Sequence, residues 1–172
     1  MARNIEIKAR VADLEAVRSR AASLATAPPE ILEQTDTFFA VPRGRLKLRR
    51  FADGTGELIA YERPDGTGPR ESSYVRCAVR EPGAIERILA RAVGVRGLVE
   101  KRRDLFMAGR TRIHLDEVRG LGCFLEIEVV LGDGEDAASG EREARALMAA
   151  LGIDASDLVP CAYIDLLDRA GA

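Results

Sequence analysis

Basic and acidic side chains occupy every second position in several segments of the sequence. Lys47 and Arg49 alternate with leucines in one segment, and Glu126 and Glu128 alternate with aliphatic residues in another. Alternate residues of a β-strand share a face, so each pair would project from one side of a strand. Guanidinium and ammonium groups bind phosphate oxygens, and carboxylates are ligands that Mg²⁺ and Mn²⁺ prefer. Brought together, the two kinds of side chain would bind a polyphosphate with a divalent metal ion.

A sheet that curls with its charged faces inward would collect these side chains in one lumen. The basic residues expected there are Lys8, Arg10, Arg45, Lys47, Arg49, Arg63, Arg110 and Arg112, with Lys101 and Arg103. The acidic residues expected there are Glu6, Asp116, Glu126 and Glu128. So many charges require water, each other or a ligand, and the basic excess favours a polyanion such as a triphosphate. The alternative is an ordinary antiparallel sheet with one solvated face.

His114 is the only histidine of the chain. It lies two residues before Asp116, so the two side chains are expected on the same strand face. We expect His114 to be hydrogen-bonded to Asp116, and the alternative is a role as a general base. The sequence identifies no other catalytic group.

Eight strands and four helices are predicted from the spacing of apolar residues. Clear alternation predicts strands at 4–11, 45–51, 56–63, 110–118 and 123–131, and weaker alternation predicts strands at 33–41, 72–79 and 98–107. Helical spacing predicts helices at 13–24, 81–92 and 137–151, with a short final helix at 157–167. Tight turns between strands favour antiparallel pairing, and the aliphatic strand faces would pack against the helices. The expected fold is therefore α+β: an eight-stranded antiparallel barrel with helices outside.

Length and composition favour one domain that spans residues 1–172, since 47% of the residues are hydrophobic and 31% are charged. The net charge of −2 provides no overall basic field, so no nucleic-acid partner is expected. No apolar run approaches the roughly 20 residues of a membrane span, so we expect no membrane partner and a cytoplasmic location. A homodimer is possible, although no exposed apolar stripe argues for one.

The charged segments, in their order along the whole chain, resemble the CYTH superfamily, which is named for class IV adenylyl cyclases and thiamine triphosphatases. The segments that carry the resemblance are Asn4-Ile-Glu-Ile-Lys8, Gly44–Arg49, Glu100–Asp104, His114–Val118, Gly122–Glu128 and Tyr163–Leu167. Asn4 replaces the first glutamate of the family's opening Glu-x-Glu-x-Lys. The resemblance implies an eight-stranded antiparallel tunnel that holds a small-molecule triphosphate with Mg²⁺ or Mn²⁺.

The resemblance also implies roles for individual residues. It implies that the metal is held by Glu6, Asp116, Glu126 and Glu128. It implies that the phosphates are held by Lys8, Lys47, Arg49, Lys101 and Arg103, with Arg63 and Arg112 as further candidates.

The stretch Tyr61–Tyr74 resembles the class IV adenylyl cyclase branch and favours the conversion of ATP to cyclic AMP and pyrophosphate. The alternative view of that stretch is a hairpin loop rich in turn formers. Two other functions are open: a phosphohydrolase of thiamine triphosphate, nucleoside triphosphate or inorganic triphosphate, and a non-catalytic polyanion-binding module. The absence of a carboxylate at Asn4 argues for the last of these.

Overall fold

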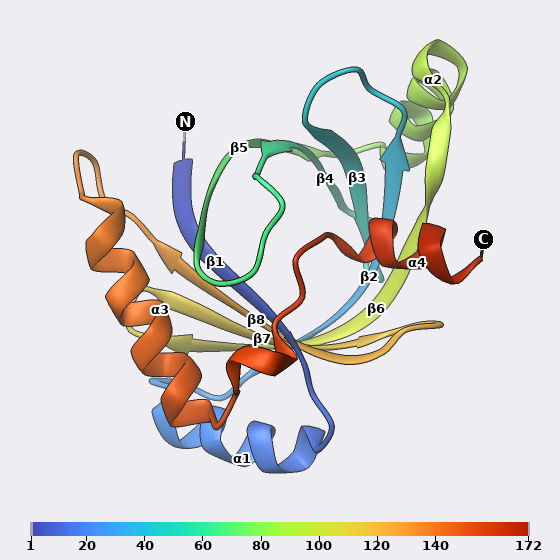
Figure 1. Ribbon diagram of the computed structural model, residues 1–172. Helices are drawn as coiled ribbons and strands as arrows, with labels where there is room; N and C mark the ends of the chain where they lie inside the picture. Colours follow the sequence, from blue (N-terminus) through green and yellow to red (C-terminus); the bar gives the residue numbers. More distant parts are fainter. Residues whose placement is uncertain (1, 172) are drawn as a thin grey trace.

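The computed structural model describes residues 2–171, and these residues form a closed barrel of eight antiparallel strands with helices outside it (Figure 1). The strands are β1 (Ala2–Arg10), β2 (Glu30–Phe39), β3 (Arg45–Phe51), β4 (Gly56–Glu62), β5 (Arg70–Val79), β6 (Val95–Ala108), β7 (Thr111–Val118) and β8 (Gly122–Val130). Their order around the barrel is β1-β5-β4-β3-β2-β6-β7-β8. This architecture confirms the α+β barrel predicted from the alternation.

Four α-helices accompany the barrel: α1 (Leu14–Leu24), α2 (Pro82–Val93), α3 (Ala137–Leu151) and α4 (Tyr163–Ala170), and a 3₁₀ turn lies at Ala155–Asp157. Asp13 caps α1 by accepting a hydrogen bond from the Ala16 amide at 3.0 Å. The predicted final helix at 157–167 was misplaced, since α4 begins only at Tyr163. The residues before α4 are extended because the Val159 amide donates to the carbonyl of Lys8 at 2.9 Å.

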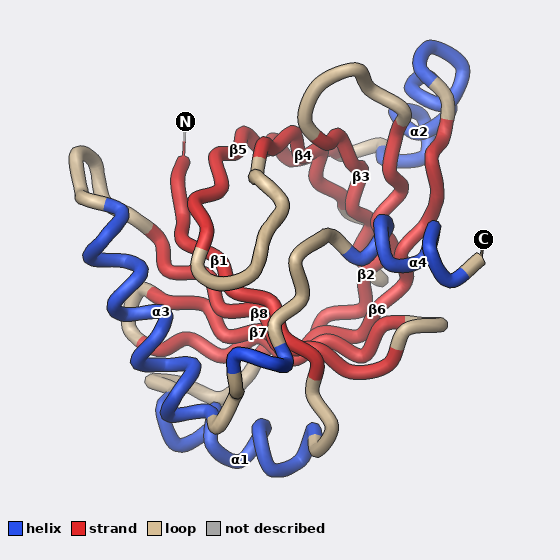
Figure 2. Tube along the Cα trace, viewed as in Figure 1, coloured by secondary structure: helices blue, strands red, loops and turns tan. Residues whose placement is uncertain are grey.

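The main hydrophobic core lies between α1, α3 and the outer faces of β1, β7 and β8 (Figures 1 and 2). Ile5, Ile7, Leu125 and Ile127 alternate with the charged residues of their strands and are fully or almost fully buried in this core. A side-chain carbon on Gly140 of α3 would lie 2.7 Å from Ile5, so glycine lets the helix approach the sheet closely. The alternation therefore places the charged faces of these strands inward.

A second apolar cluster closes one end of the barrel. It contains Phe38, Val99, Phe124, Tyr163 and Ile164, which come from β2, β6, β8 and the start of α4. Phe124 and Tyr163 meet edge to face, with ring centroids 5.0 Å apart. The C-terminal segment that leads into α4 crosses the barrel in Figure 1. The C-terminal segment consequently lies across this end of the barrel, and its residues Ala162 and Tyr163 line the lumen.

The outer face of β4 and β5 does not follow the expectation that every aliphatic face packs against a helix. Ala60 is exposed and Val75 is 56% exposed. The remaining helix of the outer layer, α2, lies against β2 and β3, and it leaves Ile88 60% exposed.

Within residues 2–171, no helix combines the length and the apolar character that crossing a membrane requires.

Candidate functional site

A cavity of about 320 Å³ occupies the barrel lumen, and residues from every strand line it. The lining charges include Glu6, Lys8, Asp36, Lys47, Arg49, Arg63, Lys101, Arg103, Arg112, Glu126 and Glu128. Every phosphate-binding residue predicted from the sequence lies in this wall, together with three of the four predicted metal ligands. The fourth, Asp116, is fully buried behind the wall on β7.

Asp36 is the centre of one group of charges in the tunnel. Its carboxylate accepts from Lys47 at 3.0 Å, from Lys101 at 2.9 Å and from both Arg49 nitrogens, Nε and Nη2, at 2.8 and 2.9 Å. The strand register explains the grouping, since Arg49 lies opposite Asp36 in the β2–β3 pair. Three cations therefore share one carboxylate, and the group carries an excess of positive charge.

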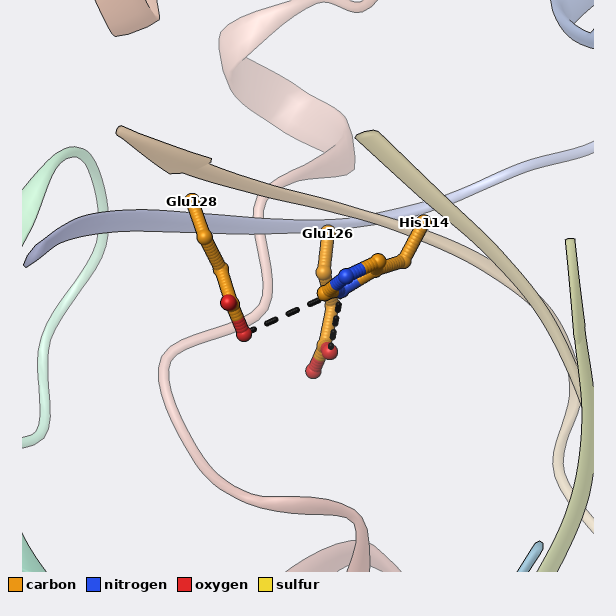
Figure 3. Close-up of side chains that lie close together, drawn as sticks. All are labelled: His114, Glu126 and Glu128. Carbon is orange, nitrogen blue, oxygen red and sulfur yellow. Dashed lines mark ion pairs between the residues drawn. The ribbon is translucent and has the colours of Figure 1, made fainter. Parts of the chain in front are cut away.

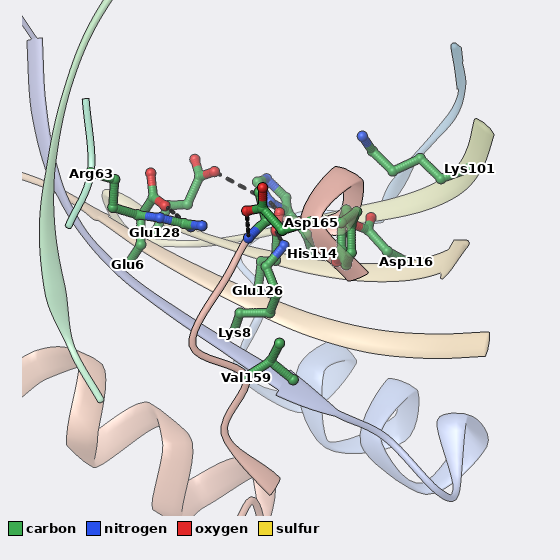
Figure 4. A network of polar contacts seen from close by, with 12 residues as sticks. Glu6, Lys8, Arg63, Lys101, His114, Asp116, Glu126, Glu128, Val159 and Asp165 are labelled. Atoms are coloured by element: carbon green, nitrogen blue, oxygen red, sulfur yellow. Dashed lines mark hydrogen bonds and ion pairs between the residues drawn. The ribbon is translucent and has the colours of Figure 1, made fainter. Parts of the chain in front are cut away.

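Glu126 is the centre of a second group. Its carboxylate lies 2.5 Å from the Lys8 ammonium and 2.5 Å from the Arg103 guanidinium. Arg103 also donates to both oxygens of Asp116 at 2.6 Å, and the Tyr163 hydroxyl donates to Asp116 at 2.9 Å. The Lys8 ammonium stands 3.2 Å from the centre of the Tyr163 ring, a cation–π contact. Figure 4 shows Lys8, Asp116 and Glu126 in the tunnel, with Lys101 apart from them.

Two further ion pairs involve predicted site residues of the tunnel wall. Arg63 donates to Glu6 at 2.7 Å, and Arg112 pairs with Glu128 at 3.0 Å. In the residues that the structure describes, every predicted phosphate-binding residue thus pairs with a carboxylate.

His114, Glu126 and Glu128 form the group best suited to a metal ion (Figure 3). One ligand atom from each residue lies within 4.8 Å of the others, and His114 Nδ1 is 3.7 Å from an oxygen of each glutamate. Nδ1 is buried and has no hydrogen-bond partner among the described residues. Two carboxylates and an imidazole suit Mn²⁺, and the carboxylates also suit Mg²⁺, so the residues present fit a divalent metal.

The expected partner of His114 is changed by the structure. His114 lies against Glu126 and Glu128 instead of Asp116, whose oxygens accept from Arg103 and Tyr163. Asp116 lies outside the group formed by His114, Glu126 and Glu128, and its role as a metal ligand stays a prediction. Glu6 lies beside Glu128 in the β1–β8 pair, so the structure keeps these two predicted ligands together.

Burial and charge act in opposite directions on the ionisable groups of the tunnel. Burial would raise the pKa of Asp36, but Arg49, Lys101 and Lys47 hold that pKa well below its usual value. Burial would raise the pKa of Glu126, but Lys8 and Arg103 hold it well below the usual value as well. Both carboxylates are consequently charged at neutral pH.

Two buried bases also have lowered pKa values, which favours their neutral forms. Burial lowers the pKa of Lys101 to about 7, and the partial compensation comes mainly from Asp36. Burial and the neighbouring Arg103 lower the pKa of His114 below its usual value of 6.5. His114 is therefore neutral at neutral pH and free to accept a proton or to bind a metal.

Three basic residues that were expected in the lumen lie elsewhere. Arg10 is exposed at the end of β1, and Arg110 is in the turn before β7, where it pairs with Glu135 and Glu143 outside the barrel. Arg45 is oriented toward the C-terminal segment, where it pairs with Asp165 at 3.0 Å. Alternation fixes the face of a strand residue but not whether the strand still lines the lumen at that position.

Sequence reasoning missed Asp36 and did not give Tyr163 a place in the tunnel wall. Asp36 lies in the weakly alternating 33–41 segment, where the polar residues Gln34 and Asp36 share a face with Phe38. Asp36 pairs with the basic residues of β3 because of the register between β2 and β3. Strand register cannot be read from a single sequence. Tyr163 belongs to a motif that was noticed, but its contact with Lys8 arises from the fold.

Comparison with known proteins identifies the family. The family model described as the CYTH domain matches residues 2–163. The PH1012 protein from Pyrococcus horikoshii is 29% identical over 95% of this chain and 98% of its own, with a TM-score of 0.83. A proposed adenylate cyclase from Vibrio parahaemolyticus is 22% identical over 96% of this chain and 97% of its own, with a TM-score of 0.77.

A proposed adenylyl cyclase from Hippeastrum that has a dominant triphosphatase activity is 16% identical, with coverage of 98% and 96% and a TM-score of 0.67. Among curated proteins nothing matches this chain. The family model covers nearly the whole chain, and the barrel with its charged lumen agrees with it. The chain therefore belongs to the CYTH domain family.

Proposed function

We propose that this protein is a divalent-metal-dependent enzyme that acts on a triphosphate inside the tunnel, and that its reaction is the adenylyl cyclase reaction, from ATP to cyclic AMP and pyrophosphate. The observation that carries the proposal is the arrangement around Glu126. This carboxylate contacts two cations, Lys8 and Arg103, and with Glu128 and His114 it completes a group able to hold a metal. Metal ligands and phosphate ligands thus share one wall.

The cations of the tunnel would bind and orient the triphosphate. Lys47, Arg49 and Lys101 form one group around Asp36, and Lys8 and Arg103 form the other around Glu126. Arginine binds phosphate through two nitrogens, which fixes orientation as well as charge. Holding the chain of phosphates at several points positions the reacting phosphorus and stabilises the charge that develops on the leaving group. Arg63 and Arg112, which pair with Glu6 and Glu128, would contact the same ligand farther along the tunnel wall.

Glu126, Glu128 and His114 would hold the metal, with Glu6 beside them. A bound Mg²⁺ or Mn²⁺ supplies positive charge to phosphate oxygens. Asp116 would keep a structural role, since it orients Arg103 through two hydrogen bonds and holds Tyr163. His114 would have one of two roles. It would bind the metal, or it would accept the proton of the attacking hydroxyl, because its lowered pKa keeps the imidazole neutral.

The cyclase assignment is supported by the resemblance of Tyr61–Tyr74 and by the places of its residues. Tyr61, Arg63, Ser72 and Tyr74 line the cavity, so both ends of this stretch belong to the tunnel wall, whereas none of residues 64–71 lines it. The structurally similar protein from Vibrio parahaemolyticus is a proposed adenylate cyclase, which agrees with the assignment.

A triphosphatase is the second candidate. The similar Hippeastrum protein is a proposed cyclase in which triphosphatase activity is dominant, so the same fold serves hydrolysis. In that reaction water attacks the terminal phosphate, and the same cations stabilise the transition state. A non-catalytic polyanion-binding module is the third candidate. It is suggested by Asn4, whose uncharged side chain is a weaker metal ligand than a carboxylate.

Product analysis distinguishes the three functions. The purified protein would be incubated with ATP and Mn²⁺ or Mg²⁺, and with thiamine triphosphate and inorganic triphosphate in parallel. Cyclic AMP with pyrophosphate is the result expected for the cyclase, and release of inorganic phosphate indicates the triphosphatase. Triphosphate binding without formation of any product would indicate the non-catalytic binding module.

Thermal melting tests the shared basis of all three functions. A triphosphate present at 100 times its dissociation constant should stabilise the fold by about 2.7 kcal/mol. An unchanged melting curve at saturating ATP and inorganic triphosphate, with either metal, would refute triphosphate binding in the tunnel.

A further inference from the structure

The open end of the tunnel differs chemically between its two sides. Arg112, Tyr74 and Arg76 lie on β7 and β5 and give one side its polar character. The opposite side, made by β2, β3 and β6, presents Leu32, Phe51 and Leu105 to the cavity, with the exposed carboxylate of Glu30 opposite Leu105. The C-terminal cluster lies across the other end, so we expect a ligand to enter past these residues.

Strand register brings the three apolar side chains together. Leu105 is opposite Glu30 and Arg103 is opposite Leu32 in the β2–β6 pair, so Leu32 and Leu105 are diagonal neighbours on one face. Phe51 is opposite Gln34, two residues from Leu32. All three apolar side chains are only partly buried. They form a partly exposed apolar patch at this end of a lumen that is lined mostly by charged and polar side chains. Phosphate groups make no favourable contact with such a patch.

Gln34 stands beside this patch and carries an unused hydrogen-bonding group. The side chain is 5% exposed, and its amide oxygen has no hydrogen-bond partner among residues 2–171. A buried acceptor without a partner costs about 1–3 kcal/mol, so a ligand that donates a hydrogen bond there gains affinity. Gln34 is opposite Lys101 in the β2–β6 pair, so the amide adjoins the cation group of Asp36.

The distances suit a ligand with two chemically different ends. Asp36 and Leu32 are four residues apart on β2, which is about 13 Å along a strand. The organic end of a triphosphate held at the level of Lys47, Arg49 and Lys101 could therefore reach the patch. Inorganic triphosphate would leave the patch and the amide of Gln34 unused.

We infer that Leu32, Phe51, Leu105 and Gln34 form a subsite for the organic end of the substrate, a flat heteroaromatic group that bears an N–H donor, as in an amino-substituted nucleobase. The inference rests on the proposed triphosphate function and narrows it to organic triphosphates. The apolar side chains cover the face of the ring, and the amide of Gln34 accepts its N–H. Specificity for the organic end would then reside on β2, β3 and β6, separate from the metal group on β7 and β8.

Calorimetry with two ligands tests the subsite. The ligands are analogues of ATP and of inorganic triphosphate in which methylene groups replace the bridging oxygens, so that neither reacts in the presence of Mg²⁺. Leu32→Ala and Gln34→Leu should each weaken binding of the ATP analogue about 10-fold. Binding of the inorganic analogue should change less than about 2-fold in both variants. Ile31→Ala is the matched control, since Ile31 is the neighbouring residue on β2 but faces outward and is 59% exposed.

The outcomes separate the subsite from the function on which it rests. If wild type binds both analogues and the two variants change both equally or neither, triphosphate binding stands and the subsite is refuted. If wild type binds neither analogue, the triphosphate function fails and the subsite fails with it. Loss of ATP affinity in Ile31→Ala equal to that in Leu32→Ala would also refute the subsite, because an outward side chain cannot contact the ligand.

Discussion

Replacing Asp36 with asparagine keeps the shape of the side chain and removes the carboxylate that three tunnel cations share. Lys47, Arg49 and Lys101 would then face one another without their common counter-ion. Removing one partner of a buried ion pair costs about 3–5 kcal/mol, and the partial exposure of Lys47 and Arg49 favours the lower end of that range. A loss of about 3 kcal/mol lowers the melting temperature of a chain of this length by about 6–12 °C.

The same variant should bind a triphosphate more tightly than wild type. In wild type the ligand competes with Asp36 for the three cations, whereas in Asp36→Asn it supplies the missing negative charge. Recovery of about 1–3 kcal/mol of the lost stability corresponds to a gain in affinity of about 5- to 150-fold. Saturating inorganic triphosphate with Mg²⁺ should therefore raise the melting temperature of Asp36→Asn more than that of wild type.

Asp104→Asn is the matched control for this experiment. Asp104 is also buried and also bridges arginines, Arg18 at 2.9 Å and Arg102 at 3.2 Å, but it lies on the outer face of β6. Both variants should melt at lower temperature, and only Asp36→Asn should be stabilised by triphosphate beyond the wild-type shift. An equal ligand shift in all three proteins would show that phosphate does not reach the Asp36 group. Weaker binding in Asp36→Asn would show that the carboxylate acts by holding the cations in position.

The remaining predictions concern the other charges of the tunnel. Arg49→Ala should weaken triphosphate binding by about 2–5 kcal/mol with or without metal in calorimetry, and an effect confined to the metal-bound state would contradict phosphate contact. Glu128→Gln should raise the metal concentration needed for binding or turnover while triphosphate affinity without metal is kept or improved. Asn4→Glu should tighten Mn²⁺ binding because it adds a carboxylate diagonally across from Glu128. Identical metal titrations of wild type, Glu128→Gln and Asn4→Glu would show that the metal binds elsewhere. Lys101 has a folded-state pKa of about 7 against 10.5 unfolded, so the unfolded chain binds more protons between these values and the contribution of Lys101 to stability rises with pH across that window. An anionic ligand raises this pKa, so triphosphate binding at pH 8 should take up a proton, seen as a dependence of the calorimetric heat on buffer ionisation enthalpy that Lys101→Met abolishes.

The sequence predicted the barrel because each strand repeats one simple rule. Ile5 and Ile7 alternate with Glu6 and Lys8, and the same pattern recurs on enough strands to define an inside and an outside. The aliphatic faces of β1, β7 and β8 are then buried against the apolar side chains of α1 and α3. The area of the barrel surface that the helices cover could not be predicted, because the alternation within a strand does not show which part of it a helix contacts. Val75 on β5 is an example, since its aliphatic side chain is exposed.

The site was less predictable than the fold, for a reason that Asp36 and Asp116 make clear. Both are buried carboxylates, but one joins a group of cations and the other is held by a single arginine and a tyrosine. Which partner a carboxylate finds depends on strand register and on the C-terminal segment that supplies Tyr163. Sequence alternation gives the face on which a charge lies, whereas pairing across strands decides what that charge does.

The pairing of charges in the tunnel also bears on how metal and triphosphate would bind. Glu126 and Glu128 pair with Lys8, Arg103 and Arg112, and these are proposed phosphate ligands. A metal that took the two carboxylates would free Lys8 and Arg112 for phosphate, and a phosphate that took these cations would free the carboxylates for the metal. Binding of either ligand would therefore favour binding of the other, and such coupling is reciprocal by thermodynamic necessity. On the proposed function, we therefore expect the ion pairs of the lumen to favour binding of the metal and the triphosphate together over binding of either one alone.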